Sequence, residues 1–402
     1  MRMTALPPRV IEVAPGPEGV TVVTEALRAR LDDDGPPIAL VPAVSRHVTA
    51  AYAKAVRAAV RPGDPVEHPD AAVIVATSGS TGHPRGVTIT RANLRAAQDA
   101  AALAIPGLDT CPWVLALPAT SVGGLVVVAR ALLSGQPVRM LPSVGGAVPF
   151  SPADLAAVPA PASVSVVPAQ LSALLDDAAA TSWLRRAHAI LVGGGRTPSA
   201  LAQRSLDLGV RIVRTFGMTE TTGGCVYDGI PLPGTTATVE EDGRIRLRGP
   251  TVAAGYRERP HRPQGDADRE SGAGVRFDGD SVLTCDLGEW RDGRLHVIGR
   301  ADDVVSVNGV NVSPHAVEEA LLAVPGVHDA AVLAVSDERR GARLVAFVTC
   351  DDGAPGADAI AEAATQLLGS AARPEVRVAD SLPRLPHGKI DRMSLMREAG
   401  AR

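Results

Sequence analysis

The chain has 402 residues, of which 46% are apolar and only 2% aromatic, and its formal net charge is −4. This length and apolar content predict two or three domains with cores built mainly from Ala, Val and Leu. The small net charge without a basic block speaks against nucleic acid as a partner. The four dispersed cysteines form no C-x-x-C pair for zinc or a disulfide framework, and the apolar stretches are too short or interrupted for a signal peptide or membrane span.

The first 235 residues alternate between helical and strand-like patterns. Helices are expected over 20–32 and 48–60, and Thr90 is placed to cap a helix over 91–104. Short apolar runs predict buried strands at Ala71–Ala76, Val87–Ile89, Val114–Leu117, Val164–Val167, Ala189–Val192 and Val210–Val213. This alternation predicts an α/β body with a mixed or parallel sheet.

Beyond residue 235 the pattern changes to alternating strands, expected at Ala237–Glu240, Arg244–Arg248 and Arg294–Ile298. Residues 257–275 are polar and aperiodic, which predicts a mobile surface loop. From about residue 300 a small α+β unit is expected, with strands at 304–307, near 329–335 and at 343–350. Its helices are expected after the cap Ser313 and Pro314, and over 359–370. We therefore predict a large domain over 1–299 and a small one over 300–402.

A hydroxyl- and glycine-rich loop, Thr77-Ser-Gly-Ser-Thr-Gly-His-Pro-Arg-Gly86, follows the strand that ends at Ala76. Glycines let backbone amides turn toward an anion and hydroxyls add donors, so such a loop forms a nest for phosphate. It lacks the spacing of a Walker loop. A flexible Ser/Gly turn is the plain alternative, but the density of hydroxyls favours phosphate. The expected ligands are Thr77, Ser78, Gly79, Ser80, Thr81 and Gly82.

Two further segments each follow an expected strand. In Thr215-Phe-Gly-Met-Thr-Glu-Thr-Thr-Gly-Gly-Cys225, Glu220 is placed to hold Mg²⁺ while Thr219 touches a phosphate, since Mg²⁺ typically takes one or two carboxylates plus substrate phosphates. Gly193-Gly-Gly195 lets a flat ring such as adenine lie against the backbone. Taken singly, Glu220 as a solvated acid and the glycines as a plain turn are the alternatives.

A carboxylate in a tight turn, Asp286, is placed to accept hydrogen bonds from ribose hydroxyls, with Arg300 further along the chain. Singly, such an aspartate is more often a turn former.

Only two lysines, Lys54 and Lys389, occur among the 40 Lys and Arg residues. Lys389 lies in the Pro/Gly-rich segment Leu382-Pro-Arg-Leu-Pro-His-Gly-Lys-Ile-Asp-Arg392. Its retention there suggests a need for a compact ammonium that can enter a tight polar gap and contact one developing anion. Together with the phosphate loop, this predicts an enzyme that handles a nucleoside triphosphate.

In this order, the motifs resemble those of the adenylate-forming superfamily of acyl-CoA synthetases, adenylation domains and luciferases. The resemblance is carried by the loop 77–86, Phe216-Gly-Met-Thr-Glu220, Gly249-Pro250 with Gly255-Tyr256, Thr284-x-Asp286, Gly299-Arg-x-Asp302 and Gly388-Lys389. It implies a large N-terminal α/β domain of β-sheets and packed helices, and a small mobile α+β C-terminal domain. It also implies two half-reactions: a carboxylate attacks the α-phosphorus of ATP, and a thiol, usually that of coenzyme A, then displaces AMP.

The resemblance assigns roles to individual residues. Lys389 would contact the carboxylate and the α-phosphate, Glu220 would bind Mg²⁺, and Thr81 and Thr219 would contact phosphate oxygens. Arg85 stands where the family usually has a phosphate-loop lysine. The residues expected around adenine and ribose are Gly193, Gly194, Gly195, Phe216, Gly217, Asp286 and Arg300.

Further roles fall near and beyond the domain boundary. Asp302 matches the hinge position of the family, and Asn308, Gly309 and Asn311 belong to a loop that would face coenzyme A. Asn308 and Cys285 also depart from the family pattern, since each stands where glycine is usual.

A narrower resemblance is to the actinobacterial o-succinylbenzoate–CoA ligases of menaquinone synthesis. It is carried by the short N-terminal domain and by Gly223-Gly-Cys-Val-Tyr-Asp-Gly-Ile-Pro-Leu-Pro-Gly234, Leu117-Pro-Ala-x-x-Val-Gly-Gly-Leu125 and Ser165-Val-Val-Pro-Ala-Gln170. The acyl-pocket residues that it implies are Thr120, Ser121, Gly124, Pro168, Gln170, Gly223 and Gly224. Thr120 and Ser121 stand where such ligases often carry histidines.

Three alternatives remain open at this point: a ligase for another carboxylic acid, an enzyme that loads a carrier protein, and a non-catalytic nucleotide-binding protein. Lys389 and Glu220 argue against the last, since a binding protein has no need of a lysine on a hinged domain. The expected partners are ATP, Mg²⁺, coenzyme A and a small carboxylic acid, without nucleic acid or a membrane span. A cytoplasmic location is expected, and the resemblance is compatible with a homodimer.

Overall fold

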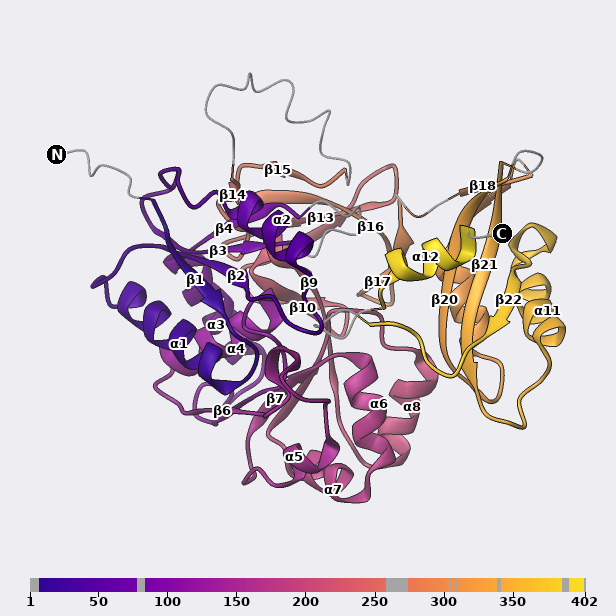
Figure 1. Cartoon of the computed structure of the whole chain (residues 1–402), viewed down its shortest axis with the longest axis horizontal. Coiled ribbons are helices and arrows are strands. Elements are labelled where there is room, and N and C mark those ends of the chain that lie inside the picture. The colour runs from indigo at the N-terminus through magenta and orange to yellow at the C-terminus, as the bar shows by residue number, and fades with distance from the viewer. Residues whose placement is uncertain are drawn as a thin grey trace.

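The computed structural model describes residues 7–77, 84–257, 274–301, 303, 305–308, 310–337, 341–384 and 390–400. The described residues up to 301 form a large part, and those from 303 onward form a small part beside it along the long axis of the molecule (Figure 1). The boundary predicted between residues 299 and 300 coincides with the end of the last strand of the large part and remains a prediction.

The first sheet of the large part carries the expected phosphate loop. Its strand order is β1 (Arg9–Val13), β2 (Ile38–Pro42), β3 (Ala71–Ala76), β4 (Gly86–Thr90), β14 (Gly255–Tyr256). The strands β1 to β3 are parallel, whereas β4 and β14 are antiparallel to their neighbours. The helices α1 (Pro17–Leu31), α2 (Ala50–Val60) and α3 (Arg91–Ala104) confirm the expected ones. As predicted, Thr90 caps α3: its hydroxyl accepts a hydrogen bond from the Asn93 amide at 3.0 Å.

The second sheet is mostly parallel and holds the centre of the core. Its strand order is β11 (Ile230–Pro231), β10 (Gly223–Tyr227), β9 (Val213–Met218), β8 (Ala189–Val192), β7 (Ser163–Val166), β5 (Trp113–Leu115), β6 (Val138–Met140). The strands β6, β5, β7, β8 and β9 are parallel, and β10 returns antiparallel along β9. The associated helical elements are α4 (Val122–Leu133), the 3₁₀ turn η1 (Val144–Gly146), α5 (Pro152–Ala156), α6 (Pro168–Asp176), α7 (Ala178–Arg186) and α8 (Ser199–Asp207).

One predicted strand of this sheet is displaced along the chain. The apolar run Val210–Val213 only leads into β9, which begins at Val213 and runs to Met218. After α8 the chain turns at Gly209, with φ of 69°, and Val210 is buried without joining the sheet. The segment Thr215–Cys225, expected to follow that strand, is instead a hairpin in which β9 and β10 are joined by the 3₁₀ turn η2 (Thr219–Thr221).

The third sheet confirms the strands expected after residue 235. Its order is β12 (Thr236–Val239), β13 (Arg244–Arg248), β16 (Ser281–Arg291), β15 (Arg276–Asp278), with β17 (Arg294–Arg300) also paired to β16. Of the predicted mobile loop 257–275, residues 258–273 lie outside the described part of the chain. Its two ends, Arg257 and Val275, are buried, so the prediction of a surface loop is wrong at both.

The small part is a sheet between helices. The sheet order is β20 (Val327–Asp337), β21 (Gly341–Cys350), β22 (Glu375–Val378). Helices α10 (Pro314–Leu322) and α11 (Ala357–Leu368) share one apolar cluster with it, and α12 (Arg392–Gly400) shares another. A hairpin of β18 (Val305–Val307) and β19 (Val310–Val312) and the 3₁₀ turn η3 (Ser370–Ala372) complete it. Among the described residues, no helix is long and apolar enough to cross a membrane.

Candidate active site

Several expected site residues follow adjacent parallel strands of the second sheet. Residues 116–121 follow β5, residues 167–170 follow β7, Gly193 to Gly195 follow β8, and Glu220 follows β9. Because parallel strands end at one edge of a sheet, these four segments lie together there. Such an edge is where open α/β sheets bind their ligands.

The expected acyl-pocket residues that follow β5 and β7 fix the backbone conformation of these two segments. The Ser121 hydroxyl caps α4, accepting from the Gly124 amide at 3.3 Å and donating to the Pro118 carbonyl at 2.8 Å. A Cβ at Gly124 would lie 2.2 Å from that carbonyl oxygen, so the turn requires glycine. Thr120 lines a small apolar hollow with Pro118 and residues of the first sheet's loops.

Pro168 begins α6, two residues before Gln170, which joins two of these segments. The Gln170 side chain accepts from the Val167 amide at 3.1 Å and donates to the Ala116 carbonyl at 3.0 Å. It therefore fixes the end of β5 relative to the start of α6.

Several of the glycines expected around adenine and in the acyl pocket lie so close to neighbouring atoms that a Cβ would not fit. A Cβ at Gly193 would lie 2.3 Å from Oγ1 of Thr215, and one at Gly217 would lie 2.0 Å from the Gly223 carbonyl oxygen. Gly223 has φ of 92°, which favours glycine, and faces Val126 of α4. The remaining expected glycines are Gly194 and Gly195, which are exposed, and Gly224, which also approaches Thr215. Phe216 packs in the cluster that joins the second and third sheets.

Of the phosphate loop, the two ends are described. Thr77 and Arg85 pair across its base: the Thr77 amide donates to the Arg85 carbonyl at 2.8 Å, and the Thr77 hydroxyl accepts from the Arg85 amide at 3.1 Å. The expected phosphate ligands Ser78, Gly79, Ser80, Thr81 and Gly82 lie outside the described residues. The loop thus leaves the sheet between two strands whose ends are fixed.

A chain of three polar side chains connects this loop to the η2 turn. Arg85 Nη2 donates to the Tyr256 hydroxyl, which donates to Glu220 Oε1 at 2.5 Å. Arg85 Nη2 lies 4.0 Å from the same carboxylate oxygen, and its guanidinium carbon is 3.7 Å from the Tyr256 ring centroid. Only 4% of the Glu220 side chain is exposed, and Thr219 beside it is half-buried. The structure therefore brings Arg85 and Glu220 together, 135 positions apart (220 − 85) in the sequence.

Burial and then the negative charge of Glu220 raise the pKa of the Tyr256 hydroxyl, against the opposing effect of Arg85. The hydroxyl therefore keeps its proton at neutral pH and remains a donor to Glu220.

Tyr256 and its neighbour Arg257 were not among the expected site residues. The sequence offered Tyr256 only as part of the Gly255-Tyr256 motif, and Arg257 only as the start of a presumed surface loop. The Arg257 side chain is fully buried and makes hydrogen bonds to the carbonyls of Val60, Arg61, Asp64 and Pro65 and to Glu67.

Glu220 is the residue of this cluster that can ligate a metal ion. No group of three or more His, Cys, Asp or Glu side chains that could hold a metal occurs in the described part of the chain. A single buried carboxylate beside a phosphate loop fits Mg²⁺, which keeps several waters and shares its ligands with substrate phosphates.

The expected ribose residues Asp286 and Arg300 lie opposite each other on β16 and β17, so the expectation that Asp286 stands in a tight turn is wrong. Arg300 Nη1 donates to Asp286 Oδ1 at 3.4 Å. The residue before Asp286, Cys285, is buried in the same cluster as Phe216. The neighbour of Asp286 in the chain thus packs with a residue of the expected adenine site.

The expected CoA-facing residues lie in the β18–β19 hairpin of the small part. Exposed Asn308 has φ of 52°, a left-handed conformation that asparagine tolerates, which explains how it can stand where glycine is usual. Asn311 pairs with Ser306 through the backbone. Gly309 and Asp302, the residue expected at the hinge, lie outside the described residues.

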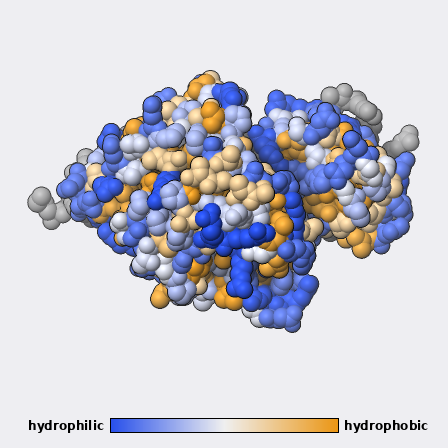
Figure 2. Space-filling model, turned by 90° about the horizontal axis from the view of Figure 1, so that it is seen from below, coloured by the Kyte–Doolittle hydropathy of each residue, from blue (hydrophilic) through white to orange (hydrophobic). Residues whose placement is uncertain are grey.

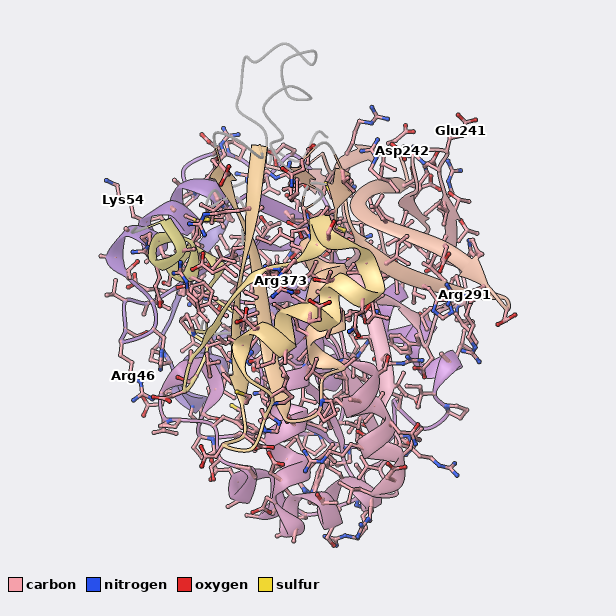
Figure 3. All side chains as sticks on the ribbon, turned by 90° about the vertical axis from the view of Figure 1, so that its right-hand side faces the viewer. Arg46, Lys54, Glu241, Asp242, Arg291 and Arg373 are labelled. Atoms are coloured by element: carbon pink, nitrogen blue, oxygen red, sulfur yellow. The ribbon has the colours of Figure 1, made fainter. Side chains whose placement is uncertain are left out.

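The predicted catalytic Lys389 also lies outside the described residues, but both flanks of its segment are described. Arg384 and Ile390 form an isolated bridge, Arg384 pairs with Asp329 of β20, and Arg392 pairs with buried Glu318 of α10. The other lysine, Lys54, is exposed on α2 and points away from the body of the protein (Figure 3).

Between the large and small parts, Arg196 and Glu319 form an ion pair. Arg196 directly follows the glycines of the expected adenine site, and Glu319 lies on α10. Seen from below, hydrophilic residues border the furrow where the two parts meet (Figure 2).

Known proteins are similar to this chain in sequence and in fold. Residues 20–257 match the family described as AMP-binding enzyme, and residues 316–389 match the AMP-binding enzyme C-terminal domain. A probable 2-succinylbenzoate–CoA ligase of Mycobacterium tuberculosis (strain ATCC 25618 / H37Rv) is 37% identical over 388 residues, which cover 95% of this chain and 96% of that protein. A 2-succinylbenzoate–CoA ligase of Bacillus cereus (strain ATCC 14579) is 29% identical over 69% of this chain and 60% of its own length.

Solved structures with the same fold include a variant of E. coli MenE with bound OSB-AMS, at a TM-score of 0.76 and 21% identity, covering 98% of this chain and 88% of that chain. The o-succinylbenzoate CoA synthetase of Bacillus subtilis in complex with OSB-AMP has a TM-score of 0.66 and 23% identity, covering 92% and 80%. The amide bond synthetase McbA of Marinactinospora thermotolerans has a TM-score of 0.71 and 22% identity, covering 97% and 90%. At these identities the likeness concerns the fold alone.

Proposed function

Because the chain belongs to the family of AMP-binding enzymes, we propose that it is an AMP-forming acid–thiol ligase that converts 2-succinylbenzoate to its coenzyme A thioester. The observation that carries the substrate is the 37% identity to the mycobacterial 2-succinylbenzoate–CoA ligase, which extends over 95% of this chain. A role in menaquinone biosynthesis and a cytoplasmic location, where ATP and coenzyme A are available, belong to the same proposal.

The reaction has two steps. In the first, a carboxylate oxygen of the acid attacks the α-phosphorus of ATP, the bond to the bridging oxygen breaks, and pyrophosphate leaves. In the second, the thiol of coenzyme A attacks the carbonyl carbon of the acyl-adenylate and AMP leaves, while the thiol proton passes to solvent. The first transition state concentrates negative charge on phosphoryl oxygens, so it needs preorganised cations and donors more than a general base.

The described residues supply much of that environment. Thr77 and Arg85 hold the ends of the loop proposed to cradle the phosphates, and Arg85 brings its guanidinium to within 4.0 Å of Glu220. Glu220 would hold Mg²⁺, which when bound neutralises charge on the phosphate oxygens. Thr219 follows β9 beside it, within reach of the same phosphates in this proposal.

The remaining roles extend the proposal to the rest of the site. Asp286 would accept from the ribose hydroxyls while Arg300 holds it, and the glycines after β8 would let adenine lie against the backbone. The acid would lie between the start of α4 and Gly223 and Gly224 of β10. Lys389, on the small domain over 300–402, would contact the α-phosphate in the first step, and the hairpin at Asn308 would face coenzyme A in the second.

Isotope exchange tests the proposal directly. ATP–pyrophosphate exchange is measured with 2-succinylbenzoate and with a panel of other aromatic and aliphatic acids, and acyl-CoA is then followed by mass spectrometry after addition of coenzyme A. We expect exchange and thioester formation with 2-succinylbenzoate well above those with the other acids. Exchange without transfer to coenzyme A would instead favour a carrier protein as acceptor, and absence of exchange with every acid would refute an adenylating enzyme.

A further inference from the structure

Tyr256 connects the two groups that the proposed function places around the triphosphate. Its hydroxyl accepts from Arg85 and donates to Glu220 Oε1 at 2.5 Å. The Arg85 guanidinium also lies over its ring, with 3.7 Å from the guanidinium carbon to the ring centroid. One side chain thus orients a proposed phosphate ligand through its ring and a proposed magnesium ligand through its hydroxyl.

The position of the Tyr256 hydroxyl is fixed from three sides. Through the backbone, Tyr256 pairs with Val87 of β4, next to the end of the phosphate loop. Its ring forms a T-shaped contact with Phe277 of β15, at a centroid distance of 5.0 Å and an interplanar angle of 78°. The next residue, Arg257, is fully buried and bound to four carbonyls and Glu67, which prevents the strand from sliding.

The η2 turn that carries Glu220 is attached to the same segment by its backbone. The Ala253 amide donates to the Glu220 carbonyl at 2.9 Å, and the Thr222 hydroxyl donates to the Thr251 carbonyl at 2.8 Å. The distance between Tyr256 and Glu220 is therefore set by the backbone as well as by the side-chain hydrogen bond.

A carboxylate that binds a metal ion is commonly oriented by a hydrogen bond to its other oxygen. Tyr256 donates to Oε1 of Glu220, so Oε2 would remain to ligate Mg²⁺. Because only 4% of the Glu220 side chain is exposed, water is a poor substitute for the tyrosine hydroxyl there.

We propose that Tyr256 is a positioning residue of the ATP site, which orients Glu220 for Mg²⁺ and Arg85 for the phosphates so that metal and nucleotide bind together. This inference rests on the proposed function in taking Mg²⁺·ATP as the ligand, but it does not depend on which acid is activated. It extends the site to a residue that contacts neither reacting atom.

The test is Tyr256→Phe, which keeps the ring over which Arg85 lies and removes only the hydroxyl. Binding of ATP without acid is measured by equilibrium dialysis across a Mg²⁺ titration, and ATP–pyrophosphate exchange is measured in parallel. Outer partners of metal ligands typically contribute about 10–100-fold to metal affinity, so we expect the Mg²⁺ concentration for half-maximal ATP binding to rise about tenfold. At saturating Mg²⁺, the exchange rate should return to within about threefold of the unmodified enzyme, since the reacting groups are intact.

The matched control is Tyr227→Phe. The Tyr227 hydroxyl also accepts from a buried arginine, Arg130 Nη2 at 2.9 Å, but on β10 against α4, away from the phosphate loop. We expect this variant to leave the Mg²⁺ titration unchanged. A second measurement introduces Tyr256→Phe into the Glu220→Gln variant. If Tyr256 acts through Glu220, the effects of the two substitutions are not additive, and Tyr256→Phe should shift the Mg²⁺ midpoint less than twofold there.

Two results would overturn the inference. One is an Mg²⁺ midpoint for Tyr256→Phe within twofold of the unmodified enzyme. The other is a lower exchange rate that added Mg²⁺ does not restore, which would indicate a merely structural role. Failure of the proposed function is seen separately, as absent exchange with 2-succinylbenzoate while Mg²⁺-dependent ATP binding persists.

Discussion

Replacing Arg257 with methionine should destabilise the large part strongly, although the sequence places this residue at the start of a polar stretch. Its guanidinium is fully buried and makes five hydrogen bonds, four of them to carbonyl oxygens between Val60 and Pro65 and one to Glu67. Removing one partner of a buried ion pair costs about 3–5 kcal/mol. Because 42% of the Glu67 side chain is exposed and can be hydrated again, we take the lower end, ~3 kcal/mol.

Thermal unfolding followed by circular dichroism measures the effect. At ~2 °C per kcal/mol for a domain of this size, Arg257→Met should lower Tm by about 6 °C. The control is Arg291→Met, because 64% of the Arg291 side chain is exposed and its pair with Glu289 lies on the surface (Figure 3). It should lower Tm by no more than about 1 °C. If both variants shift Tm equally, the buried network does not stabilise the domain and the reasoning fails.

Three further predictions concern the reaction and the small part. Lys389→Ala should abolish pyrophosphate release from acid and ATP while preformed acyl-adenylate still reacts with coenzyme A, because the ammonium is needed only at the α-phosphate; equal loss of both steps would contradict this role. Glu220→Gln should raise the Mg²⁺ concentration for half-maximal exchange at least about tenfold, and an unchanged titration would remove the metal assignment. Burial would raise the pKa of Glu318, but the hydrogen bond with His315, the charge of Arg392 and the Val332 amide outweigh it and lower the pKa. Its contribution to stability is thus present above the unfolded value of about 4.3 and lost as pH falls through the lower folded value, so the Tm gap between Glu318→Gln and the unmodified protein should be larger at pH 7 than at pH 3; an equal gap would refute this linkage.

Local patterns predicted the elements well where one signal dominated. The helix 91–104 and the strands Ala71–Ala76 and Ala189–Val192 have the predicted bounds, because a capping or polar residue marks each start and a hydroxyl residue, a glycine or a Pro-Gly pair follows each end. The strand at Val210–Val213 was misplaced because apolar character marks burial, and Val210 is buried without pairing. What extends β9 to Met218 is the close approach of Gly217 to Gly223, a contact across a hairpin that no run of apolar residues announces.

The candidate site was predicted less evenly. Motifs in the sequence pointed to Glu220, the phosphate loop and Asp286, since a short run of neighbouring residues marks each of them. Tyr256 was missed as a site residue because its partners lie 36 and 171 positions away, at Glu220 and Arg85. Arg257 was misread because a charged residue beside a polar stretch normally lies in water, whereas here four carbonyls turn inward to meet it.

The segment from Pro250 to Arg257 is bonded to α3 at one end and to the first sheet at the other. Asn93 Nδ2 of α3 donates to the carbonyls of Pro250 and Val252 at 2.8 Å, and the Arg257 amide donates to the Gly86 carbonyl of β4 at 2.8 Å. The amides of Ala254 and Arg257 donate to the carbonyls of Thr88 and Gly86, so exchange of their hydrogens for deuterium requires this segment to detach from β4. Because both ends of the segment are held, we expect the two amides to exchange as slowly as those of the core strands. The cluster around Glu220 and Tyr256 should therefore unfold only when the large part unfolds as a whole. The urea concentration that abolishes nucleotide binding should equal the concentration at which the large part unfolds, and should not be lower.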